Sequence, residues 1–272
     1  MDIIKRNFFK ILRCGALNDK QPIEPMSQYK WTKLIKLAMI NGVEAIVAKS
    51  FSRYLADNDD AIPVQIAYTF IDSQKKSATS SVIEVPEAQL SNFLLNKKLT
   101  GIRLSETDEQ GKPSETIVTL NIIIYNINQI LSIGVDLNMM LCLGKYLRMA
   151  ADKIDGTKLR NWLKSLHIQR MAQIEADILV SFLGFEEEEV PFFTHSSKGA
   201  EKILMHSVDT MGSSGRHDDI TFGQNRAGFL HNDTHAVGHK ICRAISYMRY
   251  SPIEASSNLI KKFAISLSKI EE

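Results

Sequence analysis

Three histidines near the end of the chain have a spacing that could serve metal chemistry. His231, His235 and His239 recur every four residues, so a helix would place them along one side. Two imidazoles at that spacing can share a zinc or nickel ion. A third lies about 40° further round the helix at each step, and Asp233 is the carboxylate beside them. The pattern favours dispersed surface histidines, with a metal site as the alternative.

A second group of residues could bind a polyanion. Positions 211–229 are rich in glycine, serine and aspartate, which is typical of a surface loop. A phosphate-binding loop would need a strand before it and a helix after it, and a helical pattern precedes this one. Basic residues nevertheless gather here, so a polyanion would be expected on this C-terminal face. They are Arg216, His217, Arg226, Lys240 and Arg243, and Arg249 follows soon after.

Unusual polarity marks a long apolar helix expected over 115–132 and the helix that follows it. Buried amides need hydrogen-bond partners. These side chains therefore form either an interhelical network or a partly exposed face, near residues 120–145, that is open to a partner chain. The residues in question are Asn121, Tyr125, Asn128 and Asn138.

Composition narrows the class of protein. The 33 basic and 31 acidic residues leave a formal charge of +2, which does not favour nucleic acid or an anionic membrane as a partner. The longest apolar run, 117–133, is interrupted by amides and is too polar to cross a bilayer. Cys14, Cys142 and Cys242 are far apart, which favours free thiols in a reducing compartment. We expect a cytoplasmic protein.

Helical periodicity dominates the chain and predicts a mainly α fold. We expect a helical bundle in one or two packed halves, with at most a short β-hairpin near 100–118. The expected parts are an N-terminal helical region (1–98), a polar loop (99–113) and a C-terminal helical region (114–272). Within them we expect a short helix over 87–97 and a strand at 101–104.

The second half carries a recognisable set of motifs. They are Ile154-Asp155, Trp162-Leu163-Lys164-Ser165-Leu166, Leu183-Gly184 and Pro191-Phe192. In this order they resemble the C-terminal helical region of an uncharacterised bacterial nucleotidyltransferase family that is often found beside surface-polysaccharide genes. A weaker similarity covers the first 70 residues or so.

What this resemblance implies about activity depends on a catalytic palm. The family's palm is a mixed α/β unit whose carboxylates hold magnesium ions against a nucleoside triphosphate. Between the helix expected at 87–97 and Ser114, the chain offers a polar loop too short for such a unit. The family's arginine and aspartate are also missing from the stretch 134–142. The palm therefore looks deleted.

We accordingly expect a non-catalytic, nucleotidyltransferase-like module without a cofactor, which binds an unknown protein or a second copy of itself. One alternative is a diverged active transferase that uses magnesium and a nucleoside triphosphate. Its carboxylates would come from Asp72, Glu84, Glu106, Asp108 and Glu109. Another alternative is a weak nucleic-acid-binding protein that uses the basic C-terminal face.

Overall fold

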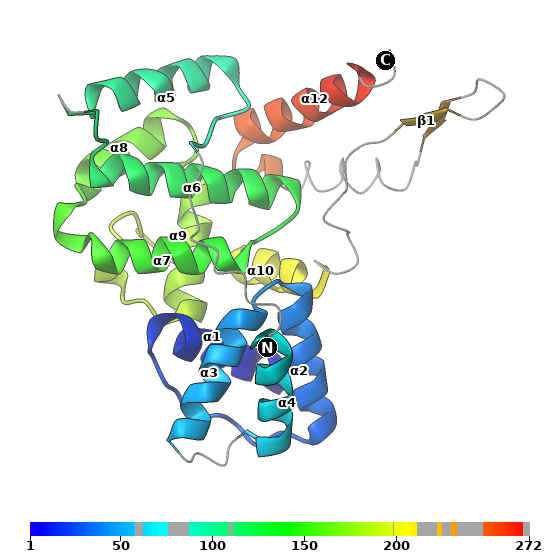
Figure 1. Cartoon of the computed structure of the whole chain (residues 1–272). Coiled ribbons are helices and arrows are strands. Elements are labelled where there is room, and N and C mark those ends of the chain that lie inside the picture. Colours follow the sequence, from blue (N-terminus) through cyan, green and yellow to red (C-terminus); the bar gives the residue numbers. More distant parts are fainter. Residues whose placement is uncertain are drawn as a thin grey trace.

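The computed structural model describes residues 1–57, 62–75, 87–108, 111–197, 199–210, 222–224, 230–232 and 247–268. Within these ranges the chain forms eleven α-helices and very little strand, so the mainly α class predicted from the sequence is confirmed (Figure 1). The one pair of strands, β1 (Phe222–Gln224) and β2 (Leu230–Asn232), is antiparallel with Gly223 opposite His231.

The first four helices pack together at one end of the molecule, in blue to cyan in Figure 1. They are α1 (Ile3–Leu17), α2 (Gln28–Ile40), α3 (Glu44–Ala56) and α4 (Val64–Lys75). The α3 helix lies between α1 and α4 and contacts both. The rings of Trp31, Phe51 and Phe70 meet edge to face in its core, an arrangement that aromatic quadrupoles favour.

The remaining helices form the other part of the molecule, and α9 is the central one among them. They are α5 (Phe93–Ser105), α6 (Glu115–Ser132), α7 (Leu137–Met149), α8 (Gly156–Ser165), α9 (Gln169–Leu183), α10 (Ala200–Thr210) and α12 (Pro252–Ser268). Short 3-10 turns occur at 151–153 and 187–189. The α9 helix contacts α1, α6, α7, α8 and α10, and every side chain from Met171 to Leu179 is buried. Most polar groups on such a buried stretch have hydrogen-bond partners.

Residues 99–105 differ from the loop and strand that the sequence predicted, because they belong to α5. The amide of Asn92 caps this helix by accepting the backbone N–H groups of residues 94 and 95. Leu95, Leu99 and Ile102 then recur at helical spacing and pack on the core. The polar run that follows is short. It closes on itself through an isolated antiparallel bridge between Thr107 and Pro113, within the region where at most a short hairpin was expected.

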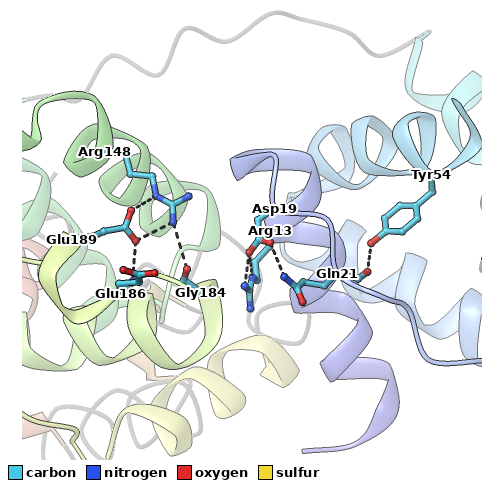
Figure 2. A network of polar contacts seen from close by, with 8 residues as sticks. All are labelled: Arg13, Asp19, Gln21, Tyr54, Arg148, Gly184, Glu186 and Glu189. Carbon is cyan, nitrogen blue, oxygen red and sulfur yellow. Dashed lines mark hydrogen bonds and ion pairs between the residues drawn. The ribbon is translucent and has the colours of Figure 1, made fainter. Parts of the chain in front are cut away.

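Two polar clusters lie where α1 approaches the end of α9 (Figure 2). In one, the guanidinium of Arg148 binds Glu189 through Nε at 2.7 Å and Nη2 at 3.1 Å. In the other, Asp19 accepts Arg13 Nε and Gln21 Nε2, both at 2.7 Å. Burial opposes ionisation of Asp19, but these donors outweigh it and lower the pKa of the carboxyl.

Further contacts join the first helices to α7 and α10. The buried amide of Asn41 donates to the carbonyl of Val208 at 3.2 Å, and Asn138 donates to the carbonyl of Gly42 at 2.7 Å. Lys5 Nζ lies 2.7 Å from Asp209. The turn between α2 and α3 is therefore held by two helices that follow it far along the chain.

None of the helices in the described ranges combines the length and apolar character needed to span a bilayer. Of the cysteines in these ranges, Cys14 is buried and Cys142 is half-buried, and both are free thiols.

Candidate anion-binding site

A cavity of about 420 Å³ opens where α9 begins. Its walls come from the first turn of α9, the irregular segment 194–197 and the turn that precedes α12. The described lining residues are Gln169, Arg170, Gln173, Thr194, His195, Ser197, Arg249 and Tyr250. Cavities of this size accommodate small organic ligands.

The wall at 194–197 is held in place by Gln173. The side chain of Gln173 is 6% exposed and makes three hydrogen bonds to this segment. Its Oε1 accepts the backbone N–H of Thr194 at 3.1 Å and the hydroxyl of Thr194 at 2.7 Å. Its Nε2 donates to the carbonyl of His195 at 2.5 Å. One buried amide thus provides hydrogen-bond partners for the irregular backbone at Thr194 and His195. It also fixes these two lining residues in place.

Asp177 holds the same wall one helical turn later. It is 3% exposed and accepts the backbone N–H of Ser197 at 2.9 Å. The hydroxyls of Ser181 and Ser196 also donate to it, at 2.8 Å and 3.2 Å. Because residues four apart lie on one face of a helix, Gln173 and Asp177 face the segment together. Asp177 is thus a structural carboxylate that is already committed to its donors.

Positive charge gathers at the mouth of the cavity. Arg170 and Arg249 are both exposed, and Arg170 Nη1 donates to the carbonyl of Arg249 at 3.2 Å. The guanidinium of Arg249 lies over the ring of Tyr250, 5.0 Å from its centre. Within the described ranges neither arginine pairs with a carboxylate, and the cavity lining contains no Asp or Glu. The charge at this mouth is therefore available to a ligand.

The start of α9 adds backbone donors to the same site. Ile168 is the residue before the helix, and its side chain cannot accept a hydrogen bond. The first N–H groups of a helix have no partner inside the helix, and they carry the positive end of its dipole. At α9 these groups belong to Gln169 and Arg170, which line the cavity.

Two other cavities lack this combination of features. In the one beside α1 and α3, Lys20 lies 2.7 Å from Asp57 and Arg53 binds the carbonyl of Cys14, so both cations are engaged. The groove between α2 and α4 is lined by Ile35, Met39, Ile66 and Phe70 among other residues, and its accessible surface is mostly apolar.

The sequence placed a polyanion site further along the chain. All five of its residues lie outside the described ranges, namely Arg216, His217, Arg226, Lys240 and Arg243. Arg249, which follows them in the sequence, lies in the cavity.

The predicted metal histidines are only partly described. His231 lies in β2, whereas His235 and His239 lie outside the described ranges. Within those ranges no group of three or more His, Cys, Asp or Glu residues could hold a metal ion.

The four residues of the expected partner face make contacts within the chain. Asn121 accepts the guanidinium of Arg103, with Nε at 3.1 Å, and Asn128 donates to the carbonyl of Gln89 at 2.8 Å. Asn138 bonds the turn after α2, and Tyr125 packs half-buried against the core. Of these contacts, the bond between Arg103 and Asn121 joins two helices, α5 and α6, whereas Asn128 and Asn138 donate to carbonyls outside the helices. The choice between an interhelical network and a face open to a partner chain stays a prediction.

The carboxylates of the alternative transferase reading lie on different elements. Asp72 is exposed on α4, Glu106 follows α5 and binds Lys158 at 3.0 Å, and Asp108 accepts the N–H of Lys112. Glu84 and Glu109 lie outside the described ranges.

Sequence reasoning missed the residues that build the cavity. No prediction from the sequence singled out Arg170, Gln173 or the segment 194–197. A signal was present, because Gln173, Glu175 and Asp177 interrupt the apolar run of a helix that is otherwise typical of a core. Comparisons of the chain with protein-family models, with curated protein sequences and with solved structures find no match.

Proposed function

We propose that this chain is a non-catalytic binding module that recognises a small anion in the cavity at the start of α9. The observation that carries the proposal is the presence of two guanidinium groups, from Arg170 and Arg249, at one cavity without a carboxylate among its described lining residues.

The chemistry of the lining fits an anion better than a neutral or cationic ligand. Guanidinium groups present planar forks of N–H donors that match carboxylate and phosphate oxygens. The first turn of α9 adds N–H groups that favour negative charge. The hydroxyl of Ser197 supplies a neutral donor on the wall formed by residues 194–197.

The resemblance to nucleotidyltransferases is compatible with this proposal and is not needed for it. A helical relative without its palm could keep a pocket for an anionic ligand and lose the reaction. A protein partner or a second copy, a bacterial source and a cytoplasmic location stay predictions made from the sequence.

The test is calorimetric titration of the full chain with phosphate, pyrophosphate, sulfate and citrate. We expect saturable binding of at least one of these anions, weakened by salt because the mouth of the cavity is open to solvent. Arg170→Gln and Arg249→Gln should each weaken it by about tenfold or more, since a hydrogen bond to a charged group contributes about 1.5–3 kcal/mol.

Lys36→Gln is the matched control, because Lys36 is an exposed cation on α2 that does not line this cavity. If both arginine variants bind as tightly as the wild type, or if Lys36→Gln weakens binding equally, the cavity is not the site.

A further inference from the structure

We infer that the ligand of this cavity is a phosphoryl group presented without a metal ion, so that magnesium weakens its binding. The inference rests on the proposed function and adds the chemical class of the ligand. Two observations support it. One is the set of hydrogen-bond donors that line the cavity, and the other is that the carboxylate of Asp177 is already hydrogen-bonded.

Several groups that can donate hydrogen bonds line the cavity. They are the guanidinium groups of Arg170 and Arg249, the start of α9 and the hydroxyl of Ser197. A phosphoryl group offers three oxygens with tetrahedral spread and up to two negative charges, so it can use donors from several walls. A carboxylate has two oxygens in one plane and a single charge. The number and spread of donors therefore favour a phosphoryl group.

The second step concerns magnesium. Magnesium is bound to proteins through one or two carboxylates together with phosphate oxygens. Asp177, which holds the wall at 194–197, already accepts Ser181, Ser196 and the N–H of Ser197. It is not among the described lining residues of the cavity. Among the described lining residues there is no carboxylate that could take its place.

The third step compares the two forms of a polyphosphate. In its magnesium complex, the ion occupies phosphate oxygens and cancels two of the negative charges. The same oxygens and charges are what Arg170 and Arg249 would bind. The metal would thus compete with the arginines and gain no carboxylate ligand from the described lining residues, so the uncomplexed phosphoryl group binds more tightly.

Room remains for the molecule that carries the phosphoryl group. A cavity of about 420 Å³ is larger than one phosphoryl group needs, and the ring of Tyr250 provides an apolar surface beside the cations. The ligand is accordingly a small phosphorylated molecule rather than the free ion.

The experiment is calorimetric titration of the full chain with inorganic pyrophosphate, once with EDTA and once with magnesium in excess. Citrate serves as a carboxylate probe of comparable charge. We expect pyrophosphate to bind about tenfold more weakly in magnesium, and citrate to bind more weakly than pyrophosphate in EDTA. Arg170→Gln and Arg249→Gln should lower the affinity in EDTA and reduce the difference between the two conditions.

The outcomes separate the two proposals. Equal or tighter binding of pyrophosphate in magnesium overturns the metal-free inference and leaves an anion site in place. Tighter binding of citrate than of pyrophosphate overturns the phosphoryl class while the anion site stands. Absence of binding by all probes in both conditions overturns the site, and the inference with it.

Discussion

The amide nitrogen of Asn126 lies 3.2 Å from Oε2 of Glu175 in the interior of the helical bundle, where both residues are almost completely buried. Oε1 of Glu175 and Oδ1 of Asn126 have no hydrogen-bond partner there. Burial raises the pKa of Glu175 well above its usual value, and the hydrogen bond from Asn126 opposes this weakly. A proton on Glu175 would give the pair a second donor.

This pair predicts how stability depends on pH. Because the pKa of Glu175 is higher in the folded chain than in the unfolded one, the folded state binds more protons between the two values. The contribution of Glu175 to stability is therefore complete below about pH 4.5 and declines as the pH rises toward the folded pKa. Glu175→Gln removes this titration and keeps an amide opposite Asn126. We expect it to be more stable than the wild type at pH 7, by a margin that grows as the pH rises toward the folded pKa.

Urea denaturation at pH 5 and pH 8 measures this effect. Glu175→Leu is the companion variant, since it leaves the amide nitrogen of Asn126 with only its 3.6 Å contact to Met140 Sδ and should cost about 1–3 kcal/mol. A Gln variant as sensitive to pH as the wild type would show that another group titrates.

A second prediction concerns the end of α9. Gly184 has a φ of +73°, and a Cβ there would overlap the guanidinium of Arg13. Gly184→Ala should cost at least about 1–2 kcal/mol from the backbone conformation, and more if Arg13 must leave Asp19. Gly101→Ala is the matched control. Gly101 lies in α5 with open space around its Cα, so alanine there should stabilise by about 0.5–1 kcal/mol. Thermal unfolding of both variants measures the two changes in stability, which we expect to have opposite signs.

A third prediction compares two N-cap residues, of which only one makes a side-chain hydrogen bond to its helix. The carboxylate of Asp136 accepts the backbone N–H groups of residues 138 and 139 at the start of α7, whereas Ser27 makes no side-chain bond at the start of α2. Asp136→Ala should cost about 1 kcal/mol and Ser27→Ala much less. Equal losses in chemical denaturation would show that the caps act through the unfolded chain instead.

A fourth prediction concerns the wall of the cavity. Gln173→Leu leaves the N–H of Thr194 and the carbonyl of His195 without partners, at a cost of about 1–3 kcal/mol for each buried group. The variant should also bind the anion more weakly. Gln173 carries no charge, and it acts by holding residues 194 and 195 in place. The measurement pairs a denaturation midpoint with calorimetric affinity at a temperature where the variant is folded. Unchanged affinity would show that the wall keeps its shape without Gln173.

A fifth prediction concerns Glu24, which lies between α1 and α2. The guanidinium of Arg6 binds both oxygens of Glu24, at 2.9 Å and 2.7 Å, and lowers its pKa to about 2. Stability from this contact is complete above about pH 4.5 and is lost as the pH falls toward 2. An NMR titration of the carboxyl carbon follows it. Arg6→Gln should return the midpoint most of the way to the usual value, leaving the smaller effect of Lys10.

The sequence predicted the helical class and the helix over 115–132, because these depend on local patterns. Asp136 and Ser114 each cap a helix, and a short polar side chain before an apolar stripe is a local signal of such a cap. The prediction of a loop and a strand over residues 99–105 was wrong. A glycine and scattered polar residues concealed the apolar helical stripe of Leu95, Leu99 and Ile102. Packing of this stripe on the core makes residues 99–105 helical.

The cavity could not be predicted from neighbouring residues. Arg170 and Arg249 are separated by 79 positions and meet through one carbonyl. Gln173 reaches a segment 21 residues ahead. Such meetings depend on how α9 is surrounded by other helices, which no local spacing reveals. The polar residues inside α9 were visible, but their partners were not.

The bond from Asn41 to Val208 joins residues that are 167 positions apart. A ribosome adds roughly 5–20 residues each second, so the turn after α2 waits for about 10–30 s before its partner has been synthesised. During that interval the amide of Asn41 lacks its bond to Val208 and has as partners the carbonyl of Leu37, which accepts it at 2.9 Å, and water. The first helices can form early, but their final arrangement is completed when α10 leaves the exit tunnel.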